Sequence, residues 1–114
     1  MKEILEVVLD CIETQRYMTA FRTLRSAIEE NQDFEDRLSL DDKTALDVLC
    51  SCLHIVVAER GVGSDAMRNY PRTAGFCERM AFLLTRKLLG DKSAGKEVDT
   101  LMFCNEAIKK LRYN

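Results

Sequence analysis

Residues that interrupt helices are scarce in this sequence, which has one proline and five glycines in 114 residues. Because so few residues favour a reversal of the chain, a sheet of many strands is disfavoured. The first thirteen residues mix acids into an apolar run without a small-residue cleavage site, so we expect no signal peptide. The longest mainly apolar segment, 48–58, is about half the ~20 residues that a membrane span needs. We therefore expect a cytoplasmic protein with no membrane association.

Motifs for catalysis and metal binding are also missing. The five cysteines form no Cys-x-x-Cys pair, and Cys50 and Cys52 would point about 200° apart on a helix. His54 follows Cys50 by four residues, but no third group is predicted to orient its ring as a catalytic dyad requires. An odd number of cysteines without a secretion signal argues against a disulfide framework. We expect free thiols on apolar helical faces, no cofactor, no metal site, no catalytic residues and no enzymatic activity.

The composition is that of one globular domain over residues 1–114. Hydrophobic residues make up 46% and charged residues 32%, which provides both a core and a solvated surface. The net charge of −2 is unevenly distributed. Residues 1–48 contain twelve acids and six bases, whereas residues 49–114 contain seven acids and eleven bases. The two halves therefore form separate acidic and basic surfaces, or they attract each other.

Apolar residues recur with the helical period along most of the chain, which predicts an all-α bundle of four to five helices. Residues 2–31 are predicted to form either one long helix or two. On one continuous helix, the apolar faces of 2–14 and 16–31 would differ by roughly 170°, which favours a turn between them, but no glycine or proline marks a turn. The predicted helices cover 2–14, 16–31, 41–60, 72–89 and 95–112.

The helix at 41–60 is predicted to be central. Ser39-Leu-Asp-Asp resembles a capping box, and Gly61 is a suitable C-terminal residue. Leucines and valines line one side of this helix, while Val48, Cys52 and Ile55 occupy the other. A helix that is apolar on two sides is buried by its neighbours or by a partner chain, so we expect a homo-oligomer.

The segment 61–75 (GVGSDAMRNYPRTAG) holds three of the glycines and the proline. It is neither a P-loop nor a complete Gly-x-Gly-x-x-Gly motif, so we expect it mainly to end one helix and start the next. Tyr70 beside the proline is a packed corner or a stacking platform. Arg72, Arg79 and Arg86 follow it at seven-residue spacing, which places them in an arginine stripe along the next predicted helix at intervals of about 10.5 Å. The candidate binding residues are Arg68, Tyr70, Arg72, Arg79 and Arg86.

Three explanations of the arginine stripe remain open. It is a solvated face or pairs with the chain's own acids at 29–47, it contacts an acidic protein, or it binds phosphate in a nucleic acid or nucleotide. The isoelectric point near 5.5 counts against a dedicated nucleic-acid domain. The leading hypothesis is a non-enzymatic helical protein that binds a protein partner, as an inhibitor, immunity or adaptor-type protein. The alternative is a binder of nucleic acid or of a phosphorylated small ligand.

Overall fold

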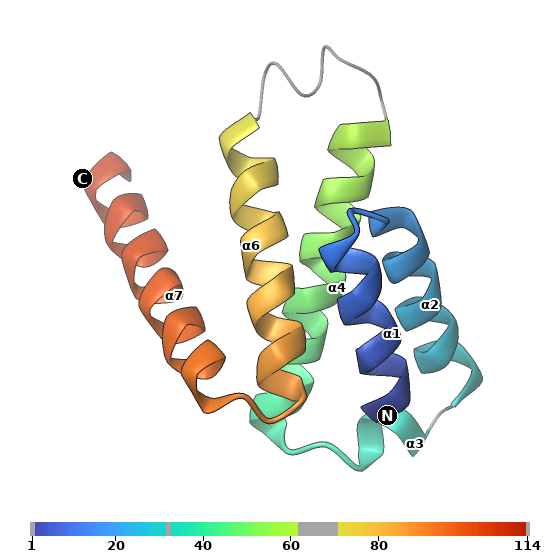
Figure 1. Cartoon of the computed structure of the whole chain (residues 1–114). Helices are drawn as coiled ribbons and strands as arrows, with labels where there is room; N and C mark the ends of the chain where they lie inside the picture. The colour runs from blue at the N-terminus through green and yellow to red at the C-terminus, as the bar shows by residue number, and fades with distance from the viewer. Residues whose placement is uncertain (1, 32, 62–70, 114) are drawn as a thin grey trace.

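The computed structural model describes the backbone of residues 2–31, 33–61 and 71–113. It describes the side chains of the same residues except 33, 35, 59–61, 71–74 and 103–113. All regular elements in this part of the chain are helices, which confirms the predicted all-α bundle (Figure 1). They are α1 (Lys2–Glu13), α2 (Tyr17–Glu30), the single turn α3 (Asp33–Asp36), α4 (Leu40–Gly61), α6 (Pro71–Leu88) and α7 (Lys92–Tyr113).

Four of the helices form a ring. Helices α1 and α4 each pack against both α2 and α6, and successive helices of the ring run in opposite directions (Figure 1). Helix α7 lies outside the ring, and its extensive contacts are with α6. None of the helices in the described residues is both long enough and apolar enough to cross a membrane.

Helix α4 is the predicted central helix, and it packs against both α2 and α6. Leu46, Leu49 and Leu53 are fully buried in the core, where each contributes about 1.5–3 kcal/mol. On the other side, Cys52 is buried and makes a hydrogen bond with Cys77 of α6, whereas Val48 and Ile55 are half-buried. The N-terminus of α4 is capped as predicted, because Ser39 Oγ accepts a hydrogen bond of 3.2 Å from the Asp42 N–H. The second apolar side is therefore covered only in part, and the homo-oligomer stays a prediction.

Residues 2–31 form two helices, not one. The turn between them has two backbone hydrogen bonds, from the Arg16 N–H to the Cys11 carbonyl at 2.7 Å and from the Gln15 N–H to the Ile12 carbonyl at 3.0 Å. This is the bonding pattern of a Schellman motif, in which glycine usually occupies the left-handed position. Here Gln15 occupies that position with φ of 61°, so no glycine marked the turn in the sequence. The chain reversal explains why the two apolar faces are rotated by roughly 170°.

A second Schellman motif joins α6 to α7. Gly90, at φ of 100°, donates to the Lys87 carbonyl at 2.9 Å, and the Asp91 N–H donates to the Arg86 carbonyl at 2.9 Å. Asp91 also caps the next helix, since its Oδ1 accepts hydrogen bonds from the N–H groups of Ser93 and Ala94. Helix α7 therefore begins at Lys92, and the prediction that it begins near Gly95 after a broken linker is wrong. The carboxylate cap starts the helix one turn earlier and offsets the low helix propensity of Gly95.

The two glycines of this junction predict opposite effects of the same substitution. Gly90→Ala should lower the melting temperature, because a left-handed residue with a Cβ is strained by about 1 kcal/mol. Gly95→Ala should raise it, since alanine is favoured by about 0.8–1 kcal/mol inside a helix. A Cβ at Gly95 would meet only Lys87 side-chain carbons, the nearest at 3.6 Å. Thermal unfolding followed by circular dichroism measures both, and destabilisation by Gly95→Ala would contradict the early start of α7.

Candidate functional site

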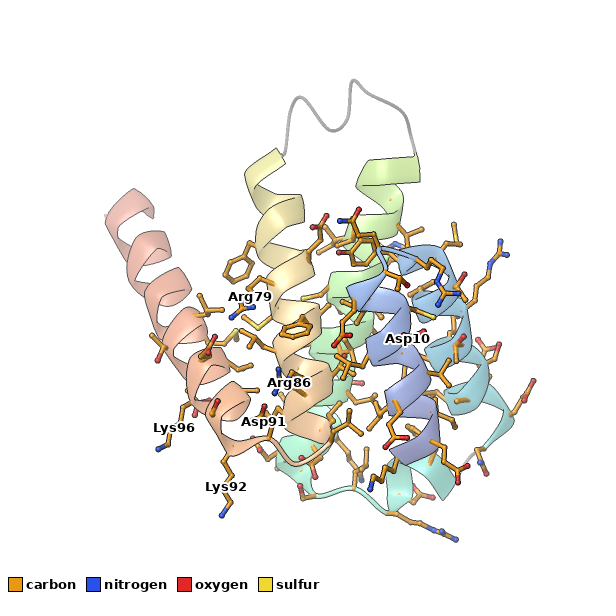
Figure 2. All side chains as sticks on the ribbon, viewed as in Figure 1. Asp10, Arg79, Arg86, Asp91, Lys92 and Lys96 are labelled. Atoms are coloured by element: carbon orange, nitrogen blue, oxygen red, sulfur yellow. The ribbon has the colours of Figure 1, made fainter. Side chains whose placement is uncertain are left out.

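The predicted arginine stripe is only partly within the described residues. Arg68 and Tyr70 lie outside them, and Arg72 is described by its backbone alone, in the first turn of α6. Arg79 and Arg86 are exposed on α6, on the side that faces α7 (Figure 2). The structure therefore brings two of the five predicted binding residues together, and the binding role of all five stays a prediction.

Arg79 and Arg86 both form ion pairs with acids that follow α6 in the chain. Arg79 Nη2 lies 2.9 Å from Glu97 Oε2, and Arg86 Nη2 lies 2.7 Å from Asp91 Oδ2. The two guanidinium groups also lie over the ring of Phe82, each with 5.5 Å from Cζ to the ring centroid. Pairing with the acids at 29–47 was one of the open explanations, and these two arginines pair with later acids instead. Asp91 lies in the turn before α7 and Glu97 lies on α7, which returns along α6 (Figure 2).

These contacts give the described arginines an internal role. An exposed ion pair is worth about 0.2–1 kcal/mol, and an exposed cation–π contact about 0.5–1 kcal/mol. Together they stabilise the packing of α7 on α6, outside the four-helix ring. The acid stretch at 29–47 also contributes one long-range pair, between Asp41 Oδ2 and Lys87 Nζ at 3.2 Å. Among the described ion pairs, this is the one that joins the acidic half of the sequence to the basic half.

A groove between α2 and α4 was not predicted from the sequence. It consists of two adjoining hollows of about 460 and 470 Å³ that share Phe21, Arg25, Glu29 and His54. We call it the α2–α4 groove. Its main lining residues are Met18, Phe21, Arg22, Arg25, Ile28 and Glu29 of α2 and Asp47, Cys50, Ser51, His54 and Val57 of α4.

The floor of the α2–α4 groove is apolar and its rim is charged. Phe21, Ile28 and Val57 are half-buried against the core and expose their remaining surface to the groove. The ring of His54 contacts that of Phe21, with centroids 5.6 Å apart and planes tilted by 52°. The guanidinium group of Arg25 also lies over the Phe21 ring, with Cζ 5.8 Å from the ring centroid. Its Nε pairs with Glu29 Oε1 at 3.0 Å. The side chains at the centre of the groove are therefore already ordered by one another.

Sequence reasoning missed the groove for a physical reason. The helical period places Phe21 and Ile28 on the apolar face of their helix, and His54, which lacks a predicted orienting group, is expected to be a structural histidine. The half-buried state of Phe21 and Ile28 depends on how far apart α2 and α4 lie, which no single helical wheel reports. The seven-residue spacing of Phe21 and Ile28 was a visible signal, but it is equally typical of a core face.

The described cysteines are free thiols, as predicted. Cys11, Cys52 and Cys77 are buried, and Cys50 is half-buried beside the α2–α4 groove. The hydrogen bond with Cys77, followed by burial, raises the pKa of the Cys52 thiol above its ordinary value. Within the described residues, no group of three or more His, Cys, Asp or Glu side chains is arranged to bind a metal ion.

Comparison with known proteins adds no assignment: no family model, no curated protein and no solved structure matches this chain.

Asp91 predicts a loss of stability in acid. Hydrogen bonding to the Ala94 N–H, followed by the charge of Arg86, lowers the pKa of its carboxyl below the ordinary value of 3.8. Because the folded-state pKa is the lower one, the stabilisation is complete above the ordinary pKa of 3.8 and is lost as the pH falls through the folded-state pKa. Asp91→Asn should lower the melting temperature at pH 6 and have a smaller effect at pH 2.5. Asp99→Asn, on the exposed part of α7, is the matched control, and an equal pH-dependent effect there would contradict this role of Asp91.

The different burial of the cysteines predicts the order in which their thiols are alkylated. With iodoacetamide at pH 8, Cys50 should react before Cys52 and Cys77, because the buried pair is shielded and the Cys52 thiol resists ionisation. Peptide mapping by mass spectrometry reads each cysteine separately. Labelling of Cys52 in the folded protein at the rate of Cys50 would show that the core of α4 and α6 is open.

Proposed function

We propose that this protein is a non-enzymatic helical module that binds another protein through the α2–α4 groove, in an inhibitor, immunity or adaptor-type role. The observation that carries the proposal is the exposed aromatic and aliphatic floor of the groove beside arginine, histidine and carboxylate groups. Buried aromatic anchors and arginines dominate the binding energy of protein interfaces, inside a polar rim. Phe21 is the expected anchor.

The arginine stripe supports the alternative function less well. Arg79 and Arg86 are paired with Glu97 and Asp91, so a phosphate ligand would have to compete with those carboxylates. Binding of nucleic acid or of a phosphorylated ligand would then depend chiefly on Arg68 and Arg72. Self-association through α4 is supported less than the sequence suggested, because α2 and α6 both pack against this helix and leave only Val48 and Ile55 of its second apolar side half-buried. A cytoplasmic location remains part of the proposal, supported by the free thiols.

Blocking the groove tests the proposal. Ser51 is exposed in the groove and its hydroxyl donates to the Asp47 carbonyl at 3.0 Å, so Ser51→Arg adds bulk and charge without removing core packing. The matched control is Thr100→Arg on α7, where the hydroxyl makes the same bond to the Lys96 carbonyl at 3.0 Å. Protein bound by the wild type in its native cell extract should be lost with Ser51→Arg and retained with Thr100→Arg. The purified partner should then bind Ser51→Arg at least about tenfold more weakly, a loss of ~1.4 kcal/mol.

The alternative function has a distinct outcome in the same experiment. If Ser51→Arg retains all bound molecules, the α2–α4 groove is not the binding surface. If Arg72→Glu with Arg79→Glu removes them and binding falls steeply with added salt, the stripe binds phosphate. An apolar contact in the groove should depend only weakly on salt.

A further inference from the structure

The α2–α4 groove has the length and the apolar spacing of a helix-binding surface. Helices α2 and α4 run antiparallel, and the groove follows α4 from Asp47 to Ala58, about 16 Å or three helical turns. The half-buried side chains repeat at seven-residue intervals on both walls, Phe21 with Ile28 and Cys50 with Val57. An amphipathic helix presents anchors at the same two-turn spacing, in positions i, i+3 or i+4, and i+7.

The rim of the groove is charged differently at its two ends. Glu29 and Asp47 lie at one end, and Arg22 and His54 lie toward the other. Arg25 and Glu29 neutralise each other in an ion pair of 3.0 Å. Neither Asp47 nor Arg22 forms an ion pair with another residue in the described part of the chain, so these two define a negative end and a positive end.

We propose that the occupant of the α2–α4 groove is an amphipathic helix of a protein partner, about three turns long and parallel to α4. Its N-terminal end lies beside Glu29 and Asp47, and its C-terminal end lies beside Arg22 and His54. This inference rests on the proposed function and adds the form and the direction of the partner. The direction follows from the helix dipole, whose positive N-terminal end is attracted to the Asp47 carboxylate and whose negative C-terminal end is attracted to Arg22.

A library of displayed helical peptides tests the form and the direction together. Each 14-residue peptide has leucine fixed at positions 4, 8 and 11, and only lysine or glutamate at the flanking positions of the first and last turns. The library is selected on the wild type and, in parallel, on Ser51→Arg. We expect the wild type to enrich peptides with lysine in the first turn and glutamate in the last turn. An isolated helix prefers the opposite order, so its own propensity cannot produce this result.

Reversal of the rim charges sharpens the test. With Asp47→Lys and Arg22→Glu combined, the charge order of the selected peptides should invert, and each changed charge should weaken the original peptides about two- to fivefold. Both residues are exposed, so the fold should be retained, which circular dichroism checks. Thr100→Arg should select the same peptides as the wild type.

Each outcome of the peptide selection tests a different part of the proposal. Groove-dependent peptides with lysine first support the helix and its direction. Groove-dependent peptides with glutamate first, or with no charge order, overturn the direction and leave the groove as a binding surface. If no peptide distinguishes the wild type from Ser51→Arg, a helix is not the occupant. Loss of the native partner with Ser51→Arg would in that case still support the proposed function.

Discussion

The packing of helix α4 between two neighbours is the constraint on which the rest of the fold depends. A single amphipathic neighbour covers one side of a helix, so a helix that is apolar on two sides needs at least two neighbours. Here α2 and α6 provide them, and α1 closes the ring between them. Within the chain this packing buries Leu46, Leu49, Cys52 and Leu53 and leaves Val48 and Ile55 half-buried.

The two tight turns of the fold, α1–α2 and α6–α7, are built alike. Both reverse the chain with a Schellman motif that has one left-handed residue. Glycine occupies that position between α6 and α7, but Gln15 occupies it between α1 and α2. The first turn is held further by the Arg16–Asp10 ion pair of 3.0 Å, and the second by Arg86 on Asp91. Polar side chains thus fix the angles at which the apolar faces meet.

Because the helices are fixed in this way, some surface side chains are paired within the chain and others are not. Along α6 and α7, Arg79 and Arg86 pair with Glu97 and Asp91 and lie over the ring of Phe82. Between α2 and α4, the aromatic and aliphatic groups stay half-exposed, and Asp47 and Arg22 have no described ionic partner. A surface that is both apolar and incompletely paired is the better candidate for a partner, and this shifts the emphasis from the arginine stripe to the groove.

The sequence by itself determined the helices, their apolar faces and the central position of α4, because helical periodicity, capping and burial are local or depend on composition. It also determined the Ser39 cap, since the hydroxyl and the N–H that it accepts from lie three residues apart. It could not decide between one and two helices in residues 2–31, because a non-glycine residue, Gln15, occupies the left-handed position of the turn. It also did not predict where α7 begins, because the carboxylate cap of Asp91 outweighs the low helix propensity of Gly95. Only the tertiary structure decided which acids pair with Arg79 and Arg86, and that α2 and α4 leave a groove between them. Those outcomes depend on distances between residues far apart in the chain, which no pattern within one helix encodes.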